Sequence, residues 1–151
     1  MSTSRVRQRR WVGRALRVCV VLVMASVLVL PWLREATGLW VLDLLDGVLA
    51  VQCHRLDGRV LDLWGMPMAV CSRCAGIYWG VMVGASLAWP RWSVRVTFVI
   101  VGVALGAMAM EAGLEAVGVL PAVHAIRLAT GAILAWPVSA IAVRRWGGLD
   151  P

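Results

Sequence analysis

Residues 18–33 read VCVVLVMASVLVLPWL, an uncharged and mostly aliphatic run that follows six arginines in the first 17 residues. A basic stretch before an apolar run is typical of either a signal peptide or a membrane span. No small-x-small cleavage site follows the run, because it ends in Pro-Trp-Leu and Arg34 comes next. We therefore predict an uncleaved transmembrane helix over residues 18–33.

The composition of the whole chain points the same way. Its 151 residues are 61% hydrophobic and 15% charged, and the mean hydropathy is +0.82, whereas soluble chains are nearer half apolar. Each membrane crossing needs about 20 apolar residues, which leaves room for about four crossings and no large soluble domain. The net charge of +7 comes from arginines that flank apolar runs. We therefore expect a lipid bilayer as partner, and no nucleic acid.

Three further apolar stretches follow the first one. They predict spans over residues 68–89, 96–119 and 122–143, and so an all-α, polytopic membrane helical bundle of about four helices in a single domain, 1–151. The outer loop between the first two spans covers residues 34–67. Within it, residues 39–52 place apolar side chains at helical spacing around two aspartates, which predicts an interfacial helix.

The arginines also predict the orientation of these spans. Arg91 and Arg95 lie between the second and third spans, and Arg144 and Arg145 follow the fourth. The short link near Leu120 has no basic residue. Because basic residues are enriched in cytoplasmic loops, we expect both termini in the cytoplasm and the protein in the inner cell membrane.

Glycines recur every four residues along two of the predicted spans. The second span has Gly76, Gly80 and Gly84, and the third has Gly102 and Gly106. Lipid gives helices no hydrophobic reason to associate, so small residues that allow close backbone approach are the usual solution. We interpret both stripes as helix-packing surfaces.

Cysteines supply the strongest chemical signal. Cys53 and His54 lie in the outer loop, and Cys71 and Cys74 begin the second predicted span. On a helix, positions 71, 74 and 78 share one face, so both thiols and the Tyr78 hydroxyl are expected to point into one outward-facing site. Cys19 lies on the inner side and is expected to be an inert apolar residue.

This pattern resembles a family of small bacterial and archaeal predicted membrane proteins of uncharacterised function. The family signature is Cys-His-Gln/Arg, an Arg a few residues on, and then Cys-x-Arg-Cys-x-Gly-x-Tyr. Here it is matched by residues 53–55, by Arg59 and by residues 71–78. Further on, 111–115 reads EAGLE where the family shows Asp-Gly-x-x-Gln, and Arg127 with Thr130-Gly131 is similar to its Arg-x-x-Thr-Gly segment. The resemblance supports the site without supplying an activity.

Charged residues inside predicted spans are costly and are candidates for functional sites. We expect several polar residues to form a second shell around the cysteines: Arg59, Arg73, Tyr78, Glu111 and Arg127. The alternative is a buried ion pair that only joins helices, between Glu111 or Glu115 and Arg127 or Arg73.

Three functions compete for the cysteine cluster, and the sequence does not decide whether the protein is an enzyme. The first is a transition-metal site, zinc or similar, with Cys53, His54, Cys71 and Cys74 as ligands. The second is a membrane thiol-disulfide oxidoreductase that passes electrons to a quinone, with Arg73 beside the sulfurs lowering a thiol pKa. The third is a structural subunit with a stabilising disulfide. A homo-oligomer or a larger membrane complex stays open.

Overall fold

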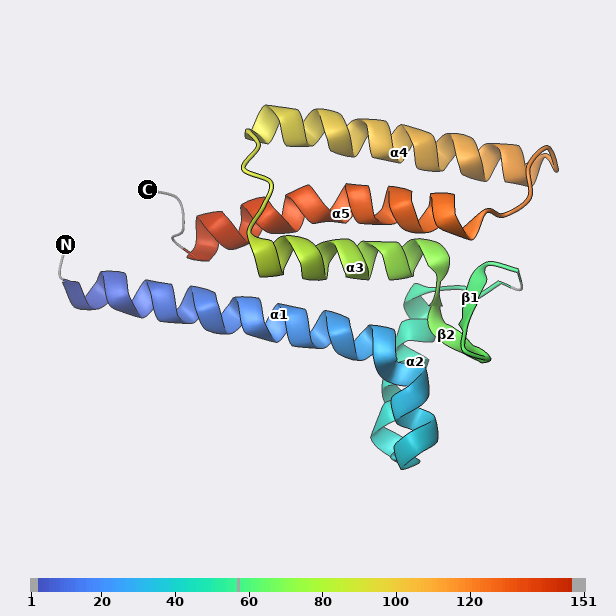
Figure 1. The fold of residues 1–151 in the computed structure, drawn as a ribbon, viewed down its shortest axis with the longest axis horizontal. Helices are drawn as coiled ribbons and strands as arrows, with labels where there is room; N and C mark the ends of the chain where they lie inside the picture. Colours follow the sequence, from blue (N-terminus) through green and yellow to red (C-terminus); the bar gives the residue numbers. More distant parts are fainter. Residues whose placement is uncertain (1–2, 57, 148–151) are drawn as a thin grey trace.

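Helices make up most of the computed structural model, which describes residues 3–56 and 58–147 (Figure 1). In chain order the elements are α1 (Thr3–Thr37), α2 (Trp40–Gln52), β1 (Val60–Leu63), β2 (Met66–Cys71), α3 (Ser72–Leu87), α4 (Val94–Ala116) and α5 (His124–Gly147). The helices α1, α3, α4 and α5 run side by side along the long axis, as Figure 1 shows. Three helices of the described chain are long and apolar enough to cross a membrane: α1 from Trp11 to Thr37, α4, and α5 from His124 to Arg145. The predicted class of an all-α membrane protein is confirmed.

The directions of the long helices place both ends of the described chain together. In Figure 1, α1 and α4 run one way along the bundle and α3 and α5 run the other way, so the start of α1 and the end of α5 lie at the same end. We call this the terminal end of the bundle. The opposite end carries α2 and the two strands, and we call it the loop end.

The second predicted span, 68–89, is wrong at its start. Residues Met66–Cys71 form strand β2, and helix α3 begins only at Ser72. Pro67 explains part of this difference, because proline lacks an N–H group and restricts the residue before it to extended backbone. With 16 residues, α3 is about 24 Å long, shorter than a hydrocarbon core of about 30 Å. The four predicted spans correspond to three long helices and one short one.

The other predicted boundaries need smaller corrections. Helix α1 extends beyond 18–33 at both ends. Helix α4 ends at Ala116, three residues before the predicted end, and Gly118 follows in the left-handed region with φ of 74°. Helix α5 begins at His124, so Pro121 lies in the link before it.

The two strands form an antiparallel hairpin that was not predicted. Leu63 pairs with Met66, and Trp64 and Gly65 between them both have positive φ, at 52° and 78°. Two residues with positive φ are typical of a tight hairpin turn whose twist matches that of the strands. The hairpin leads directly into α3, because β2 ends at Cys71 and α3 begins at Ser72.

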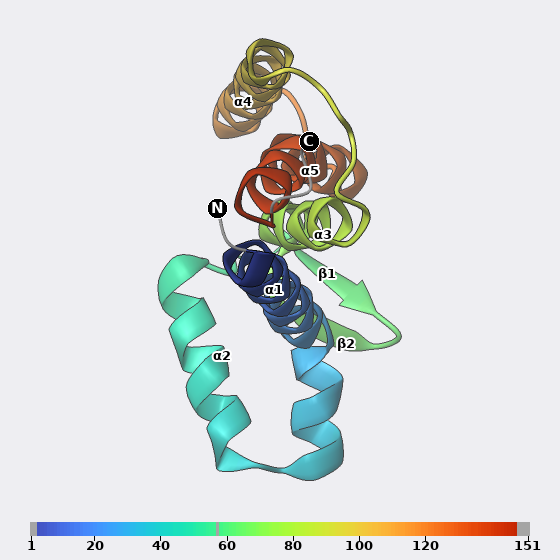
Figure 2. The ribbon, with the colours of Figure 1, turned by 90° about the vertical axis from the view of Figure 1, so that its left-hand side faces the viewer.

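The outer loop contains the predicted helix, since α2 covers Trp40–Gln52. Pro31 lies inside α1, and the last part of α1 turns away from the bundle and runs beside α2 (Figure 2). A proline inside a helix removes one backbone hydrogen bond and commonly bends the axis. As a result α2 lies across the bundle axis at the loop end, with Trp40 and Val51 exposed.

Only one of the two predicted glycine stripes is a packing surface in this chain. A Cβ atom at Gly80 would lie 2.5 Å from the backbone oxygen of Ala132 in α5, and Gly76 and Gly84 are equally close to that helix. Apart from the helix itself, no atom of residues 3–56 and 58–147 lies within 4 Å of a Cβ placed at Gly102 or Gly106. The core of the bundle is therefore the contact between α3 and α5, and α4 lies against α5 without using its glycines.

Candidate metal centre at the loop end

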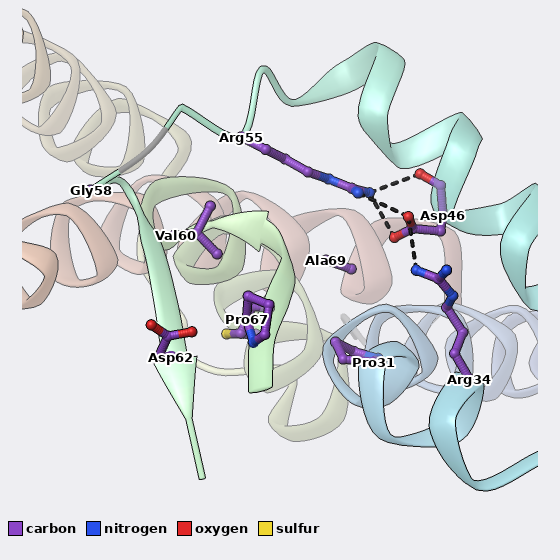
Figure 3. Close-up of a pocket in the computed structure, with 10 residues that line it drawn as sticks. Pro31, Arg34, Asp46, Arg55, Gly58, Val60, Asp62, Pro67 and Ala69 are labelled. Carbon is purple, nitrogen blue, oxygen red and sulfur yellow. Dashed lines mark hydrogen bonds and ion pairs between the residues drawn. The ribbon is translucent and has the colours of Figure 1, made fainter. Parts of the chain in front are cut away.

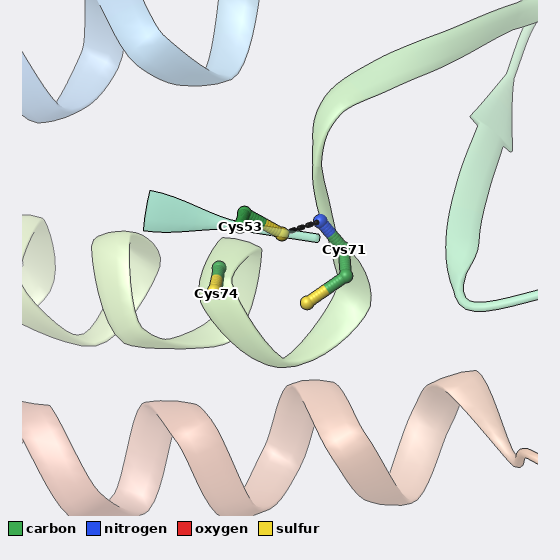
Figure 4. A group of neighbouring side chains, drawn as sticks. All are labelled: Cys53, Cys71 and Cys74. Carbon is green, nitrogen blue, oxygen red and sulfur yellow. Dashed lines mark hydrogen bonds between the residues drawn. The ribbon is translucent and has the colours of Figure 1, made fainter. Parts of the chain in front are cut away.

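Three cysteine sulfurs meet where the hairpin joins α3. The sulfur atoms of Cys53, Cys71 and Cys74 all lie within 4.8 Å of one another, and no disulfide joins them (Figure 4). Figure 4 shows the three side chains pointing toward one another from separate segments. The sequence predicted this convergence, although Cys53 and Cys71 are 18 residues apart.

Local structure explains how each sulfur reaches this point. Cys53 follows the last residue of α2 in extended backbone and is buried, with 5% of its surface exposed. Cys71 is the last residue of β2, and Cys74 lies in the first turn of α3, so a change from strand to helix brings their thiols together. The backbone N–H of Cys71 donates a hydrogen bond to the Cys53 sulfur, with 3.1 Å between the two atoms.

Hydrogen bonding within the cluster favours a thiolate at Cys71. The pKa of Cys71 is lowered from 9.0 to about 5, mainly because the Cys74 thiol donates to the Cys71 sulfur, against the opposing effect of burial. The Cys53 side chain and the backbone of Cys74 and Arg73 contribute to the same lowering. The Arg73 charge was expected to act on the sulfurs, but its guanidinium binds Glu111 and is not among these causes.

His54 lies apart from the three sulfurs. Its side chain is exposed, and the described groups close enough to share one ion are the three cysteines alone. The chain continues away from Cys53 through Arg55, whose φ of 42° turns the backbone, and Arg55 binds both carboxylate oxygens of Asp46 at 2.8 and 2.9 Å. The predicted set of four ligands is therefore three sulfurs in this structure.

Four of the five residues that were expected to surround the cysteines pair with one another and with Glu115 in an ion network. They are Arg59, Arg73, Glu111 and Arg127. Arg127 in α5 is 2% exposed and pairs with both Glu111, at 2.8 Å, and Glu115. Glu111 also pairs with Arg73 of α3, and Glu115 pairs at 2.7 Å with Arg59, which precedes β1. The alternative expectation, an ion pair that joins helices, is confirmed. Glu115 was absent from the predicted shell, although its spacing of one helical turn from Glu111 could have indicated it.

Tyr78 alone of the predicted second shell packs beside the cysteines. It is half-buried against the apolar cluster that contains Cys53, and its hydroxyl donates to the Gln52 side-chain oxygen at 3.1 Å. Gln52 is a residue that sequence reasoning missed as a partner. Its position directly before Cys53 links the end of α2 to α3 next to the sulfurs.

A pocket of about 390 Å³, lined by both charged and apolar residues, lies beside the hairpin (Figure 3). Asp46 binds Arg34 at 3.0 Å and Arg55 at 2.8 Å on one wall, and Asp62 lies on the opposite wall. These ion pairs tie α2 to the end of α1, and so they support the segment that presents Cys53.

The donor chemistry of the cysteine cluster fits a soft or borderline transition metal. In a tetrahedral zinc site, sulfurs about 2.3 Å from the ion lie roughly 3.8 Å from one another, so the cluster would need only a small contraction. Three protein ligands leave the fourth position of such an ion open. Thiolates also accept Cu(I), whereas Mg²⁺ and Ca²⁺ prefer oxygen ligands.

Long apolar helices with a cluster of thiols at one end of the bundle define a class, the helical membrane proteins with a cysteine site. Residues 53–141 match the model of the family described as predicted membrane protein DUF2085, which begins at the first clustered cysteine. The chain therefore belongs to this family of membrane proteins, as the resemblance of its motifs indicated.

One relative extends the match toward the amino terminus. The chain is 31% identical over 114 residues to the uncharacterized protein MJ1492 of Methanocaldococcus jannaschii, which covers 71% of this chain and 72% of the relative. No solved structure has significant similarity to the chain. The comparisons thus establish a family of membrane proteins, and its chemistry has to be argued from the site.

Proposed function

We propose that this protein binds a transition-metal ion of the zinc type through the thiolates of Cys53, Cys71 and Cys74. The observation that carries the proposal is the placement of three sulfurs within 4.8 Å of one another from two distant segments. The backbone N–H of Cys71 donates to the Cys53 sulfur, and hydrogen bonds of this kind orient metal ligands. The metal would leave one coordination position for a small ligand or substrate.

His54 is the sequence-derived candidate for that fourth position. It follows Cys53 directly, and its side chain is exposed, so a rotation of the loop would be needed to bring its ring to the ion. We favour three thiolates with an open position, because adjacent residues bind one ion only with irregular backbone. A site with an open position is the form that catalytic zinc takes.

The orientation proposed from the arginines agrees with the arrangement of the helices. The start of α1 and the end of α5 lie at one end of the bundle. With that end in the cytoplasm of a cell with an inner membrane, the cysteine site faces the outer side.

The test is the metal content of the full chain, purified in detergent without oxygen and measured by elemental mass spectrometry. We expect about one metal ion per chain, and its loss in Cys71→Ser/Cys74→Ser. Cys19→Ser is the matched control, because Cys19 is exposed on α1 and outside the cluster. Size-exclusion chromatography of each variant separates loss of metal from loss of the fold.

His54→Ala is the informative second variant. Retention of metal would support the site with three thiolates, and loss of metal would make His54 the fourth ligand. Absence of metal from the parent protein and from Cys19→Ser, under anaerobic conditions, would rule the proposal out.

Thiol redox chemistry is the second candidate, and the lowered pKa of Cys71 favours it. A thiolate of a substrate protein would attack the Cys71–Cys74 disulfide at Cys71 and release the Cys74 thiolate as the mixed disulfide forms. Attack by a second substrate thiolate would then form a disulfide within the substrate and release Cys71 as a thiolate, so that two electrons pass from the substrate to the cysteine pair. A quinone would accept these two electrons and two protons, become a quinol and restore the Cys71–Cys74 disulfide. Trapping of a mixed disulfide in Cys74→Ser, with no metal in the parent protein, would favour this candidate over metal binding.

A further inference from the structure

Helix α2 has an apolar side that no other part of the described chain covers. Four of its residues recur at spacings of four, four and three, which places them in one stripe along the helix, and two more lie beside the stripe. An exposed apolar surface of this kind is typical of an interaction site. The six side chains are between 41% and 84% exposed, and we call them the apolar face of α2: Trp40, Val41, Leu44, Leu45, Val48 and Val51.

The two carboxylates of α2 lie outside this face, and both have arginine partners. Asp46 pairs with Arg34 at 3.0 Å and with Arg55 at 2.8 Å. Asp43 also pairs with Arg34, at 2.7 Å. The ion pairs therefore join α2 to the end of α1 and to the chain that follows α2. Because the apolar face contains no charged group, its contact with hydrocarbon would not remove water from an ion.

The direction of α2 indicates which partner covers the face. Helices α1, α4 and α5 contain the candidate membrane spans and run along the bundle axis, so this axis follows the membrane normal. Helix α2 runs across the axis, beside the last part of α1 and away from α4 and α5 (Figures 1 and 2). Val29 and Leu33 of α1 are exposed as well, so α2 continues an apolar outer surface. Lipid is the partner that fits an apolar helix parallel to the membrane plane.

Few contacts within the chain hold α2 in place. The structure describes all of α2, and Leu49 is its only buried residue. Leu49 belongs to the same apolar cluster as Cys53, and its carbonyl oxygen accepts a hydrogen bond from the Cys53 N–H at 2.9 Å. Cys53 is the residue that ends the helix. A displacement of α2 would therefore move the Cys53 sulfur away from those of Cys71 and Cys74.

We propose that the apolar face of α2 inserts into the bilayer surface at the loop end and thereby holds Cys53 in the cysteine site. Burial of aliphatic side chains in lipid supplies stabilisation beyond that of one buried leucine and partly exposed ion pairs. Trp40 suits the boundary between headgroups and acyl chains, because its indole is apolar with a single N–H. The consequence for metal binding rests on the proposed function, whereas the contact with lipid does not.

The first test labels the lipid-facing residues of the full chain. The protein is reconstituted in vesicles of phosphatidylethanolamine and phosphatidylglycerol, a hydrophobic diazirine is photolysed in the lipid, and labelled peptides are identified by mass spectrometry. We expect α2 to be labelled as strongly as α4, whose Phe98 and Val103 are exposed on a candidate span. Labelled α4 together with unlabelled α2 would overturn the proposal.

Glutamine substitutions test whether the apolar face is responsible. Leu44→Gln/Val48→Gln changes two neighbours on the face and should lower the labelling of α2 by about tenfold or more, the effect of losing apolar burial at each side chain. Ala50→Gln is the control, because it adds the same amide to the same helix outside the face. Equal losses in the two proteins would overturn the proposal. Val51→Gln, in the last turn of α2, replaces the double variant if size-exclusion chromatography shows that the latter does not fold.

The reactivity of Cys53 tests its dependence on α2 without any metal. In metal-free protein in the same vesicles, we expect Leu44→Gln/Val48→Gln to speed alkylation of the buried Cys53 by about tenfold, and Ala50→Gln to leave it unchanged. Unchanged Cys53 reactivity in a variant that has lost its α2 label would overturn the proposed link to the cysteine site. Because neither test needs a metal, these failures are distinct from a failure to bind zinc.

A second copy of the chain is the competing partner for the apolar face. A dimer in detergent that Leu44→Gln/Val48→Gln dissociates, and Ala50→Gln does not, would assign the face to that second copy and overturn the proposal. A monomer in detergent whose α2 is labelled in vesicles would support contact with lipid.

Discussion

Helices α3 and α4 carry the same glycine spacing, and the structure uses it in only one of them. On α3 the three glycines let the backbone of α5 approach so closely that no Cβ atom would fit. On α4, Gly102 and Gly106 face open space, and large apolar neighbours such as Phe98 and Val103 are exposed. A repeat of small residues therefore permits close packing and does not by itself choose a partner.

Helix α4 is attached by charge in place of close backbone contact. Its two glutamates lie one turn apart near its end, and both pair with the buried Arg127 of α5. Arg73 and Arg59 extend the pairing to α3 and to the start of the hairpin. This comparison, of a helix held by packing with a helix held by ion pairs, leads to four predictions.

The largest effect is expected when the centre of the ion network is removed. Arg127→Met leaves Glu111 and Glu115 without their shared buried partner, which should cost about 3–5 kcal/mol of unfolding free energy. The measurement is reversible unfolding of the purified protein in mixed micelles. Arg95→Met in the first turn of α4 is the control and should change the free energy by less than about 0.5 kcal/mol. Equal losses in the two variants would mean that the network does not hold α4.

Alanine at the two sets of glycines should have effects of opposite sign. Gly80→Ala places a methyl group against the α5 backbone and should destabilise the protein by about 2 kcal/mol. Gly106→Ala adds a methyl group where nothing lies within 4 Å, and the better helix propensity of alanine should stabilise the protein by about 0.5–1 kcal/mol. The same unfolding assay compares both. A loss of stability in Gly106→Ala would show that α4 uses its glycines to pack after all.

Cys71 should stay reactive at acidic pH because its thiolate is favoured by groups at residue 53 and the start of α3. Its pKa of about 5 keeps it ionised as the pH falls to 6, and its alkylation should slow only below about 5. At pH 6 we expect alkylation to be about tenfold faster than in the unfolded chain, because a lower pKa also reduces nucleophilicity. Peptide mass spectrometry after iodoacetamide treatment of metal-free protein measures this.

The pH dependence of Cys71 alkylation in Arg127→Met would test whether the cysteine site depends on the attachment of α4. The groups that lower the Cys71 pKa belong to Cys53, Arg73 and Cys74. Detachment of α4 should therefore leave the pH dependence of Cys71 alkylation unchanged. A shift of the pH dependence toward the ordinary cysteine pKa of 9.0 would show that the ion network maintains the site.

The smallest effect is expected at the edge of the network. Arg59 is partly exposed, so its ion pair with Glu115 should contribute about 0.5–1 kcal/mol. Arg59→Gln should therefore speed amide hydrogen exchange in β1 and leave exchange in α3 unchanged. Arg34→Gln, which removes another partly exposed ion pair at the loop end, should leave β1 exchange as it is. Unchanged β1 exchange in Arg59→Gln would mean that backbone pairing alone holds the hairpin.

The class of fold and the location of the site could be predicted from local patterns. Apolar runs long enough for a bilayer identified the spans, and the helical spacing in the outer loop identified α2. The motif around Cys71 and Cys74 identified the cysteine site, although the expected helix face includes only Cys74, since Cys71 ends β2 and α3 begins at Ser72. The hairpin was missed, since its strands of four and six residues are short and its turn has Trp64 where glycine or asparagine is usual.

The sequence by itself determined a membrane protein with long apolar helices and a cysteine-rich segment, because hydropathy and spacing are properties of the chain alone. The tertiary structure decided which side chains meet. It brought Cys53 to the other two sulfurs, left His54 outside, and turned Arg73 and Arg127 toward glutamates. It also chose α5 as the partner of α3. These outcomes depend on how helices far apart in the chain approach one another, which no local pattern specifies.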